Sequence, residues 1–271
     1  MTTPPQAQPA DSTSAGSPAG GRTTAARAVD LTKTYGSGQA QVVALDDVTV
    51  DLYAREFTAV MGPSGSGKST LMHCCAALDS ASGGAVFIGD TNLSGLKDKE
   101  LTRLRRDQIG FVFQSFNLVP TLTAEENILL PLSIAGRKPE KDWYDTVIGA
   151  VELGPRLGFR PNELSGGQQQ RVAVARALVS QPSIVFADEP TGNLDSHSGA
   201  EVLTLLRRSV DEFGQTVVMV THDPVAAAFT DRVVFLGDGK VVGELLEPDR
   251  EQVLARMTSL DARELDRVAG D

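Results

Sequence analysis

The chain of 271 residues is poor in cysteine and in aromatic side chains, and it has no long apolar run. Its two cysteines, Cys74 and Cys75, are adjacent, so they cannot join distant loops and they form no zinc-binding pattern. No stretch approaches the roughly 18 apolar residues of a membrane-spanning helix, and the first residues lack the apolar core of a secretory signal. These absences predict a soluble protein of a reducing compartment.

Positive charge is also scarce. Lysine and arginine together number 25 against 35 aspartates and glutamates, which gives a net charge of -10. Because such a surface repels phosphate backbones and anionic headgroups, we expect no nucleic-acid partner and no direct membrane insertion. The 41% of hydrophobic residues is nevertheless enough for a large packed core, which excludes a chain that is disordered throughout.

Composition divides the chain into three parts. Residues 1–26 are mostly small or polar and are predicted to form a disordered tail. In residues 27–247 β-rich runs alternate with helical patterns, which predicts an α/β domain with a largely parallel sheet and a helical insertion at about 115–180. Residues 248–271 form a charged extension, for which we expect a terminal helix. The runs predicted as strands are 42–52, 57–61, 85–88, 109–113, 184–187, 216–220, 233–236 and 240–244, and the helical patterns are 68–78, 124–157, the residues after 167, and 199–213.

A glycine-rich segment follows an apolar strand and opens a helix. Its sequence is Gly62-Pro63-Ser64-Gly65-Ser66-Gly67-Lys68-Ser69-Thr70. The glycines let several backbone N–H groups point at an anion, and the helix N-terminus adds partial positive charge. Lys68 supplies a full charge to nucleotide phosphates, and the Ser69 hydroxyl suits Mg²⁺. A turn that only caps a helix is the alternative, but the strand–loop–helix context favours a site for ATP and Mg²⁺.

An apolar run ends in two adjacent carboxylates, Asp188 and Glu189. A solvated strand end would also be polar, which is the alternative interpretation. Given the phosphate loop, we interpret Asp188 as the acidic partner of Mg²⁺. Glu189 is then placed to orient or deprotonate the attacking water.

A third motif, Leu164-Ser165-Gly166-Gly167-Gln168-Gln169-Gln170-Arg171, lies between the other two. With them it resembles the signature of ATP-binding cassette (ABC) ATPases, over about residues 29–244. The resemblance implies a P-loop NTPase fold of the ABC type, with a mixed sheet core, an inserted helical subdomain and an N-terminal antiparallel β part. It also implies a homodimer, in which each ATP lies between one phosphate loop and Ser165, Gly167 and Gln168 of the other copy.

Four more residues match the family's motifs. Tyr35 resembles the aromatic residue that stacks on adenine, although an edge-strand tyrosine is the alternative. Gln114 resembles the glutamine that touches Mg²⁺ and senses the membrane partner. Asp195 resembles the residue that communicates across the dimer interface. His222 resembles the histidine that contacts the γ-phosphate, although a lone histidine at a strand end is more often structural.

The resemblance also implies a partner and a location. Residues 116–123, with Glu125-Glu126-Asn127 and the three glutamines after Gly167, are similar to cassettes of the lipoprotein-release, macrolide-export and cell-division type. Such a subunit hydrolyses ATP at the cytoplasmic face of the membrane and powers a separate integral-membrane permease. A mechanotransmission ATPase that moves an external domain without transport is the alternative. A soluble ABC ATPase of translation or DNA repair is disfavoured by the single cassette and the acidic charge.

Two positions depart from the family's pattern. Arg55-Glu56 stands where Gly-Glu is usual, and Ala76-Ala77 stands where glycine is frequent. Both lie outside the phosphate site, so they place neither ATP binding nor hydrolysis in doubt. Cys74 and Cys75 are interpreted as packing residues of the first helix.

Overall fold

The computed structural model describes residues 22–270, so most of the predicted tail lies outside the described part. The first strand, β1 (Thr24–Tyr35), begins within the stretch that composition assigned to that tail. Ala26 pairs with Leu52 on one side and with Ile88 on the other. Backbone pairing and the burial of the Ala25 and Ala26 side chains in the core therefore order these small residues together.

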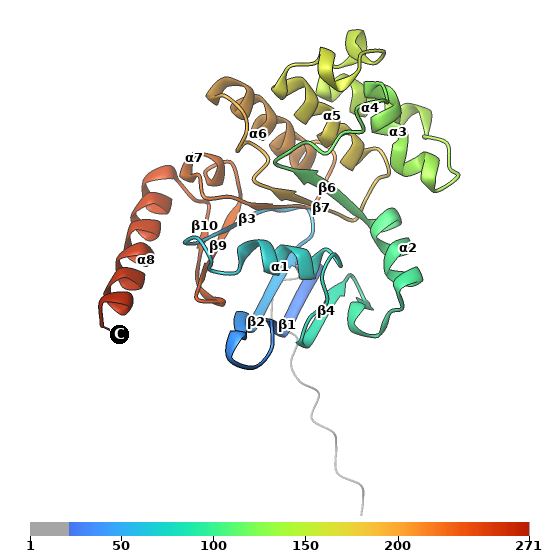
Figure 1. The fold of residues 1–271 in the computed structure, drawn as a ribbon. Coiled ribbons are helices and arrows are strands. Elements are labelled where there is room, and N and C mark those ends of the chain that lie inside the picture. The colour runs from blue at the N-terminus through green and yellow to red at the C-terminus, as the bar shows by residue number, and fades with distance from the viewer. Residues whose placement is uncertain (1–21, 271) are drawn as a thin grey trace, which may run out of the picture.

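Two sheets and a layer of helices make up the fold (Figure 1). The larger sheet has six strands in the order β10-β9-β3-β8-β7-β6. They are β3 (Phe57–Met61), β6 (Ile109–Phe113), β7 (Ile184–Asp188), β8 (Val217–Val220), β9 (Arg232–Gly237) and β10 (Lys240–Leu246). All neighbours in this sheet are parallel except β9 and β10, which form a hairpin, so the largely parallel sheet is confirmed.

The central strands are apolar because both of their faces are covered. In β3 the side chains of Phe57, Ala59 and Met61 join the core on one face of the sheet, and Val60 joins the core on the other face. Alternation with a period of two is a property of any strand, and a strand buried on both faces is a continuous apolar run. This is why the run 57–61 predicted its strand correctly.

The smaller sheet is antiparallel, with the order β2-β1-β4-β5. Its other strands are β2 (Val42–Tyr53), β4 (Gly83–Ile88) and β5 (Thr91–Asn92). Helix α1 (Lys68–Cys75) lies between the two sheets, where Leu71, Met72 and both cysteines are buried (Figure 1). Burial raises the pKa of Cys74 to about 11 and that of Cys75 to about 12, as befits packing residues. The predicted helix 68–78 is too long, because the chain turns at Ala77, whose φ is 56°.

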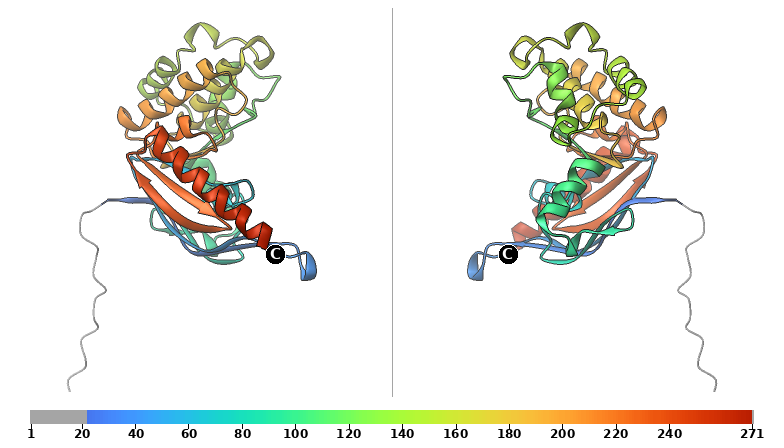
Figure 2. Two further views of the ribbon diagram at one scale, coloured as in Figure 1. Left: turned by 90° about the vertical axis from the view of Figure 1, so that its left-hand side faces the viewer. Right: turned by 90° about the vertical axis from the view of Figure 1, so that its right-hand side faces the viewer.

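Helices form a layer on the other face of the larger sheet. The insertion between β6 and β7 contains α3 (Ala124–Ile134), α4 (Lys141–Val151) and α5 (Gly166–Leu178), and α6 (Ser196–Asp211) covers the same face. The other elements are α2 (Asp98–Gln108), α7 (Pro224–Ala227), α8 (Arg250–Gly270) and 3-10 turns at Gly38–Ala40, Leu93–Gly95, Gly154–Arg156 and Pro161–Glu163. The C-terminal helix α8 lies against β10 and α7, with Val253 and Leu260 buried (Figure 2).

Within residues 22–270 no helix combines the length and the apolar character needed to cross a bilayer.

Candidate active site

Four parallel strands end at one edge of the larger sheet, and each leads to a predicted motif (Figure 1). β3 leads into residues 62–70, β6 into Gln114, β7 into Asp188 and Glu189, and β8 to His222. Because the carboxyl ends of parallel strands meet at one edge, residues far apart in sequence converge there.

The glycine-rich loop has the backbone of an anion cradle. Gly62, Gly65 and Gly67 have φ angles of 152°, 82° and 97°, which favour glycine. Gly67 is the N-cap of α1 and no side chain caps this helix, so the N–H groups of the first turn are left for a ligand. The Ser66 hydroxyl is buried without a hydrogen-bond partner among the described residues, and a phosphate oxygen is the kind of group that would satisfy it.

Lys68 folds back over the loop that precedes it. Its Nζ donates to the carbonyl oxygens of Gly62 at 2.9 Å and of Pro63 at 2.6 Å. These acceptors are neutral, and a phosphate is a stronger partner for an ammonium group. The geometry thus keeps the charge of Lys68 in the cradle.

Asp188 lies at the base of the loop, where Ser69 donates a hydrogen bond to it. Burial raises the pKa of the Asp188 carboxyl, while the charges of His73 and Lys68 and the Ser69 hydroxyl oppose that rise. A cation beside this carboxylate would favour its charged form. The Asp188 carboxylate and the Ser69 hydroxyl are oxygen donors of the kind that Mg²⁺ takes together with nucleotide phosphates. Among residues 22–270 no three His, Cys, Asp or Glu side chains converge on a metal site.

Glu189 and His222 contact each other directly. Nδ1 of His222 lies 2.8 Å from Oε1 of Glu189. The Glu189 backbone has a φ of 45° and its N–H donates to the Val220 carbonyl, so the residue is held in the left-handed region, which costs on the order of 1–3 kcal/mol. Backbone strain of this kind clusters at active sites. The contact between Glu189 and His222 joins the two residues predicted to act on the γ-phosphate and its water.

Gln114 is tied to the loop that follows Glu189. Its Nε2 donates to Asn193 Oδ1 at 3.2 Å, and Asn193 Nδ2 donates to the Gln114 carbonyl at 3.1 Å. Gln170 of α5 is buried behind them and donates to the carbonyls of Phe113 and Pro190. These hydrogen bonds connect Gln114 and α5 to the segment beside Glu189.

The signature segment caps its own helix. Ser165 Oγ accepts from the Gln168 N–H at 3.3 Å, and Gln168 Oε1 accepts from the Ser165 N–H at 3.0 Å. A Cβ on Gly167 would lie 2.9 Å from the Ser198 side chain, which explains the glycine there. The neighbours of the signature glycines belong to the segments around Gln114 and Asp195, and not to the phosphate loop.

Asp195 and Tyr35 each have partners within the chain. Asp195 caps α6 by accepting from the N–H groups of His197 and Ser198 and from the Ser198 hydroxyl, and these bonds hold the pKa of its carboxyl below the usual range. The Tyr35 hydroxyl donates to Asp79 at 2.7 Å, and the residue is 42% exposed. The structure thus fixes where these two side chains lie, while their predicted contacts with a second copy and with adenine stay predictions.

Sequence reasoning missed three supporting residues. Gln170 stood inside the quoted signature motif and Asn193 two residues before Asp195, so their position was a signal, but their partners are distant in sequence. Asp79 carried no signal at all.

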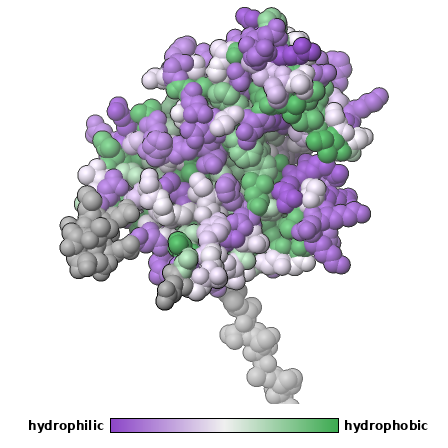
Figure 3. Space-filling model, viewed as in Figure 1, coloured by the Kyte–Doolittle hydropathy of each residue, from purple (hydrophilic) through white to green (hydrophobic). Residues whose placement is uncertain are grey.

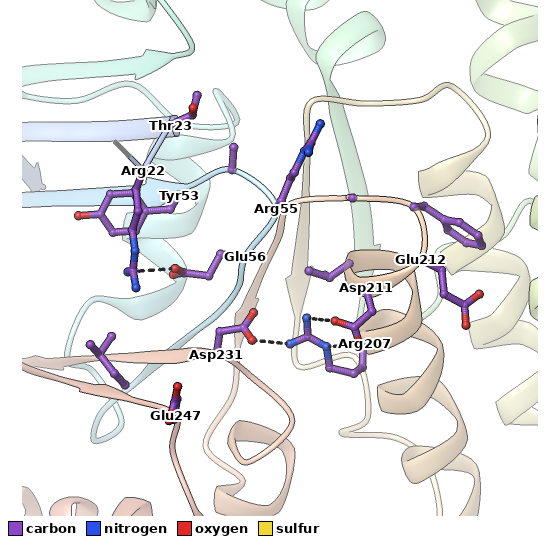
Figure 4. Close-up of a pocket in the computed structure, with 15 residues that line it drawn as sticks. Arg22, Thr23, Tyr53, Arg55, Glu56, Arg207, Asp211, Glu212, Asp231 and Glu247 are labelled. Atoms are coloured by element: carbon purple, nitrogen blue, oxygen red, sulfur yellow. Dashed lines mark hydrogen bonds and ion pairs between the residues drawn. The ribbon is translucent and has the colours of Figure 1, made fainter. Parts of the chain in front are cut away.

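A large hollow of the described surface lies away from this site. A cavity of about 1340 Å³ is lined by Arg22, Tyr53, Arg207, Asp231 and their neighbours, at the opposite ends of the parallel strands (Figure 4). Its charged groups are largely paired with one another, for example Arg22 with Glu56 and Arg207 with Asp231. It also contains none of the residues predicted for the nucleotide site.

The fold and the loop define a P-loop nucleoside triphosphatase. The family described as ABC transporter matches residues 45–192. An uncharacterized ABC transporter ATP-binding protein, MJ0796 of Methanocaldococcus jannaschii, is 47% identical over 222 residues, which cover 79% of this chain and 94% of the relative. The chain belongs to the family of ABC transporter ATP-binding cassettes, as its three motifs indicated.

Other relatives carry export names. The bacitracin export ATP-binding protein BceA of Halalkalibacterium halodurans is 41% identical, over 83% of this chain and 90% of that protein. The macrolide export ATP-binding/permease protein MacB of Brucella melitensis is 44% identical over 82% of this chain. This chain spans only 35% of MacB, about a third of its length.

Solved structures confirm the fold. A dimeric structure of MJ0796 has a TM-score of 0.74 and 44% identity, and covers 82% of this chain and 99% of that one. A second MJ0796 dimer, in a post-hydrolysis state with ADP and Pi, has the same TM-score and 43% identity. The expected mixed sheet and N-terminal antiparallel sheet are both present.

Both departures from the family's pattern include a residue whose backbone lies in the left-handed region. Arg55 has a φ of 60° and Ala77 has a φ of 56°. Glycine adopts these values without strain, so the glycine that the resemblance places at such positions would suit this backbone. Neither residue contacts the phosphate loop in the hydrogen-bond network described above.

Proposed function

We propose that this chain is the ATP-binding and ATP-hydrolysing subunit of an ABC exporter, and that two copies close around two Mg-ATP to drive a separate membrane permease. The observation that carries the proposal is that one chain has two separate helix N-termini suited to bind an anion, those of α1 and α5. The phosphate loop can hold one nucleotide, and the signature helix can offer N–H groups to a second nucleotide. Within one chain the signature glycines lie against residues 116, 194 and 198 and not against the phosphate loop. A head-to-tail pair would bring each loop to the other copy's signature helix, and the dimeric MJ0796 cassettes support that arrangement.

Within this site each residue has a distinct part. Lys68 and the loop N–H groups bind the phosphates, and Ser69, Asp188 and Gln114 would hold Mg²⁺, which offsets phosphate charge when bound. Glu189 would accept a proton from the attacking water, and His222 would keep the Glu189 carboxylate in place through the 2.8 Å contact.

The permease would dock beside Gln114. A groove of about 420 Å³ lies between α2, β6 and α3, with an apolar lining that includes Ile109, Phe111, Phe113, Leu130 and Ile134. Hydrophobic side chains gather on this face of the molecule (Figure 3). Ile134 is 72% exposed and belongs to this apolar groove, and a contiguous exposed apolar patch is typical of an interaction site. The link from Gln114 to Asn193 would carry a movement of the groove to Glu189.

Export is favoured over a purely mechanical role by the relatives' names. MacB and BceA are named as macrolide and bacitracin export proteins, so a drug or peptide class of substrate is the proposal for this chain's permease. Co-purification of the tagged chain from membranes with a multi-span subunit would test the coupling.

Glu189→Gln tests the catalytic assignment. The amide keeps the size of the side chain but cannot accept the proton, so ATP hydrolysis should fall by about 10²–10⁴-fold. Binding should survive, because Lys68, Ser69 and Asp188 are intact. We expect the variant to accumulate as an ATP-bound dimer in gel filtration with Mg-ATP, with phosphate release measured in parallel.

Glu201→Gln is the matched control, since Glu201 lies on the exposed face of α6 beside His197. It should hydrolyse ATP at the wild-type rate. Brisk hydrolysis by Glu189→Gln would assign the base to another residue, with His222 the first candidate. A folded variant that neither binds ATP nor dimerises would make Glu189 structural.

A further inference from the structure

Tyr35 is held by residues that lie outside the sequence motifs. Its hydroxyl donates to Asp79 Oδ2 at 2.7 Å, and Thr70 in the first turn of α1 is a second hydrogen-bond neighbour. The other Asp79 oxygen accepts from Lys33 Nζ at 2.6 Å and from the Ser80 N–H at 2.7 Å. One carboxylate therefore joins the end of β1 to the connection that follows α1.

Lys33 is the buried member of this group. It is 7% exposed, and besides Asp79 it donates to the Ser80 carbonyl at 2.7 Å. Burial disfavours both charges, but the hydrogen bond and the mutual attraction outweigh it, so the pKa of Lys33 is raised and that of Asp79 is lowered. The pair is thus charged, and each of its partners is fixed.

Lys33 also occupies one side of the Tyr35 ring. Its Nζ lies over the ring, 4.8 Å from the centroid, within the range of a cation–π contact. With the hydroxyl tied to Asp79 and one face covered, the ring is left with its other face for a ligand. Thr70 places the ring beside the helix turn that follows the phosphate loop.

We propose that Asp79 and Lys33 are positioning residues for Tyr35, and that they fix its ring as a stacking platform for the base of the bound nucleotide. The proposal rests on the proposed function, in which the phosphate loop holds ATP. A ring that is already immobile loses little freedom when a base stacks on it, so preorganisation contributes to affinity for the base and not for the phosphates.

The experiment compares a ligand with a base and one without. Dissociation constants of ATP and of inorganic tripolyphosphate are measured by calorimetry on the full chain with EDTA, so that hydrolysis does not contribute. Asp79→Ala should weaken ATP binding by about threefold to tenfold and leave tripolyphosphate binding unchanged. Asp79→Asn keeps a neutral acceptor and should lie between Asp79→Ala and wild type.

Three further variants show whether Asp79 acts through the ring. Tyr35→Ala should weaken ATP binding by about tenfold to a hundredfold, as loss of base stacking does. Asp79→Ala should add nothing in that background, because coupled residues are not additive. Asp145→Asn is the control, since Asp145 pairs with Lys141 at the same 2.6 Å on the exposed face of α4.

Several outcomes would overturn the proposal. They are an unchanged ATP affinity in Asp79→Ala, an equal loss for both ligands, or a further loss when Asp79→Ala is added to Tyr35→Ala. If Asp79→Ala does not fold, Tyr35→Phe takes its place, with an expected loss of about twofold to fivefold for ATP alone. A wild-type chain that binds tripolyphosphate as tightly as ATP overturns the platform but not the phosphate site, whereas one that binds neither overturns the proposed function itself.

Discussion

Helices α1 and α5 both begin in a segment rich in serine and glycine, yet they complete their N-termini in opposite ways. At α1 the N-cap is Gly67 and no side chain caps the helix. At α5 the N-cap is Ser165, and Ser165 and Gln168 satisfy each other's backbone N–H groups. The first helix end is left for a ligand. At the second, side chains satisfy the N–H groups of Ser165 and Gln168, so the N–H groups of Gly166 and Gly167 are the ones that could meet an anion.

The two helix N-termini are alike in the charge of their first turns. Neither α1 nor α5 has an acidic residue in its first turn, whereas α3 has both Glu125 and Glu126 there. An acidic first turn would repel a phosphate from the helix dipole. The α5 end is therefore partly capped by its own side chains and has no acidic residue that would repel an anion, as expected for a half-site that meets a nucleotide only when a second copy brings it.

This difference predicts that the affinity for a single nucleotide resides at α1. Lys68→Ala removes the one full positive charge of the loop, and losing such a contact typically costs about 10²–10³-fold in rate. Hydrolysis, measured by phosphate release, should fall by that amount, and ATP binding by one chain should weaken with it.

Lys141→Ala, at an exposed position of α4, is the control and should leave turnover unchanged. Wild-type turnover in Lys68→Ala would refute the assignment of the phosphate site.

The same difference predicts that α5 matters only between two chains. In Ser165→Arg a long cation replaces the cap at the surface that would meet the partner's nucleotide. ATP binding by the single chain should stay within about twofold of wild type, while light scattering should show no ATP-dependent dimer. Ser94→Arg adds the same charge at an exposed position beside β5 and should dimerise normally. Unchanged ATP-dependent dimers in Ser165→Arg would count against the head-to-tail pair.

The sequence predicted the strands that are buried on both faces and the motifs at their ends, because continuous apolar runs and glycine-rich loops are local patterns. It did not predict α2, which has a single buried side chain, Leu104, and a mostly charged sequence. Its apolar stripe consists of only two leucines, Leu101 and Leu104, which is too short a pattern to mark a helix by itself.

Contacts between residues distant in sequence could not be predicted from local patterns either. Lys33 and Asp79 meet because β1 lies beside the connection after α1, and nothing in either local sequence marks the pair. The Gln114–Asn193 bonds likewise depend on β6 and β7 being neighbours in the sheet. Local patterns therefore defined the groups that face the nucleotide, while the residues that hold those groups in place depend on the tertiary structure.

The smallest expected effect concerns the backbone that leads to the uncapped helix. At Gly67 a Cβ would lie 2.4 Å from the Ala44 carbonyl oxygen, so glycine is required there. At Arg55, just before β3, the backbone is also left-handed but carries a large side chain. Relief of this strain exceeds the entropy that glycine adds to the unfolded chain, so Arg55→Gly should raise the unfolding midpoint by about 1–3 °C.

Arg55→Ala separates backbone strain from loss of the arginine side chain, because alanine keeps the strain and loses the same contacts, including the approach to Gly214. In differential scanning calorimetry without nucleotide, Arg55→Ala should unfold at or below the wild-type midpoint, and Arg55→Gly above both. ATP turnover should be the same in all three proteins, because Arg55 lines the hollow at the opposite ends of the parallel strands (Figure 4). If Arg55→Gly unfolds below Arg55→Ala, the left-handed backbone at this position is not strained, and the family's glycine there has another cause.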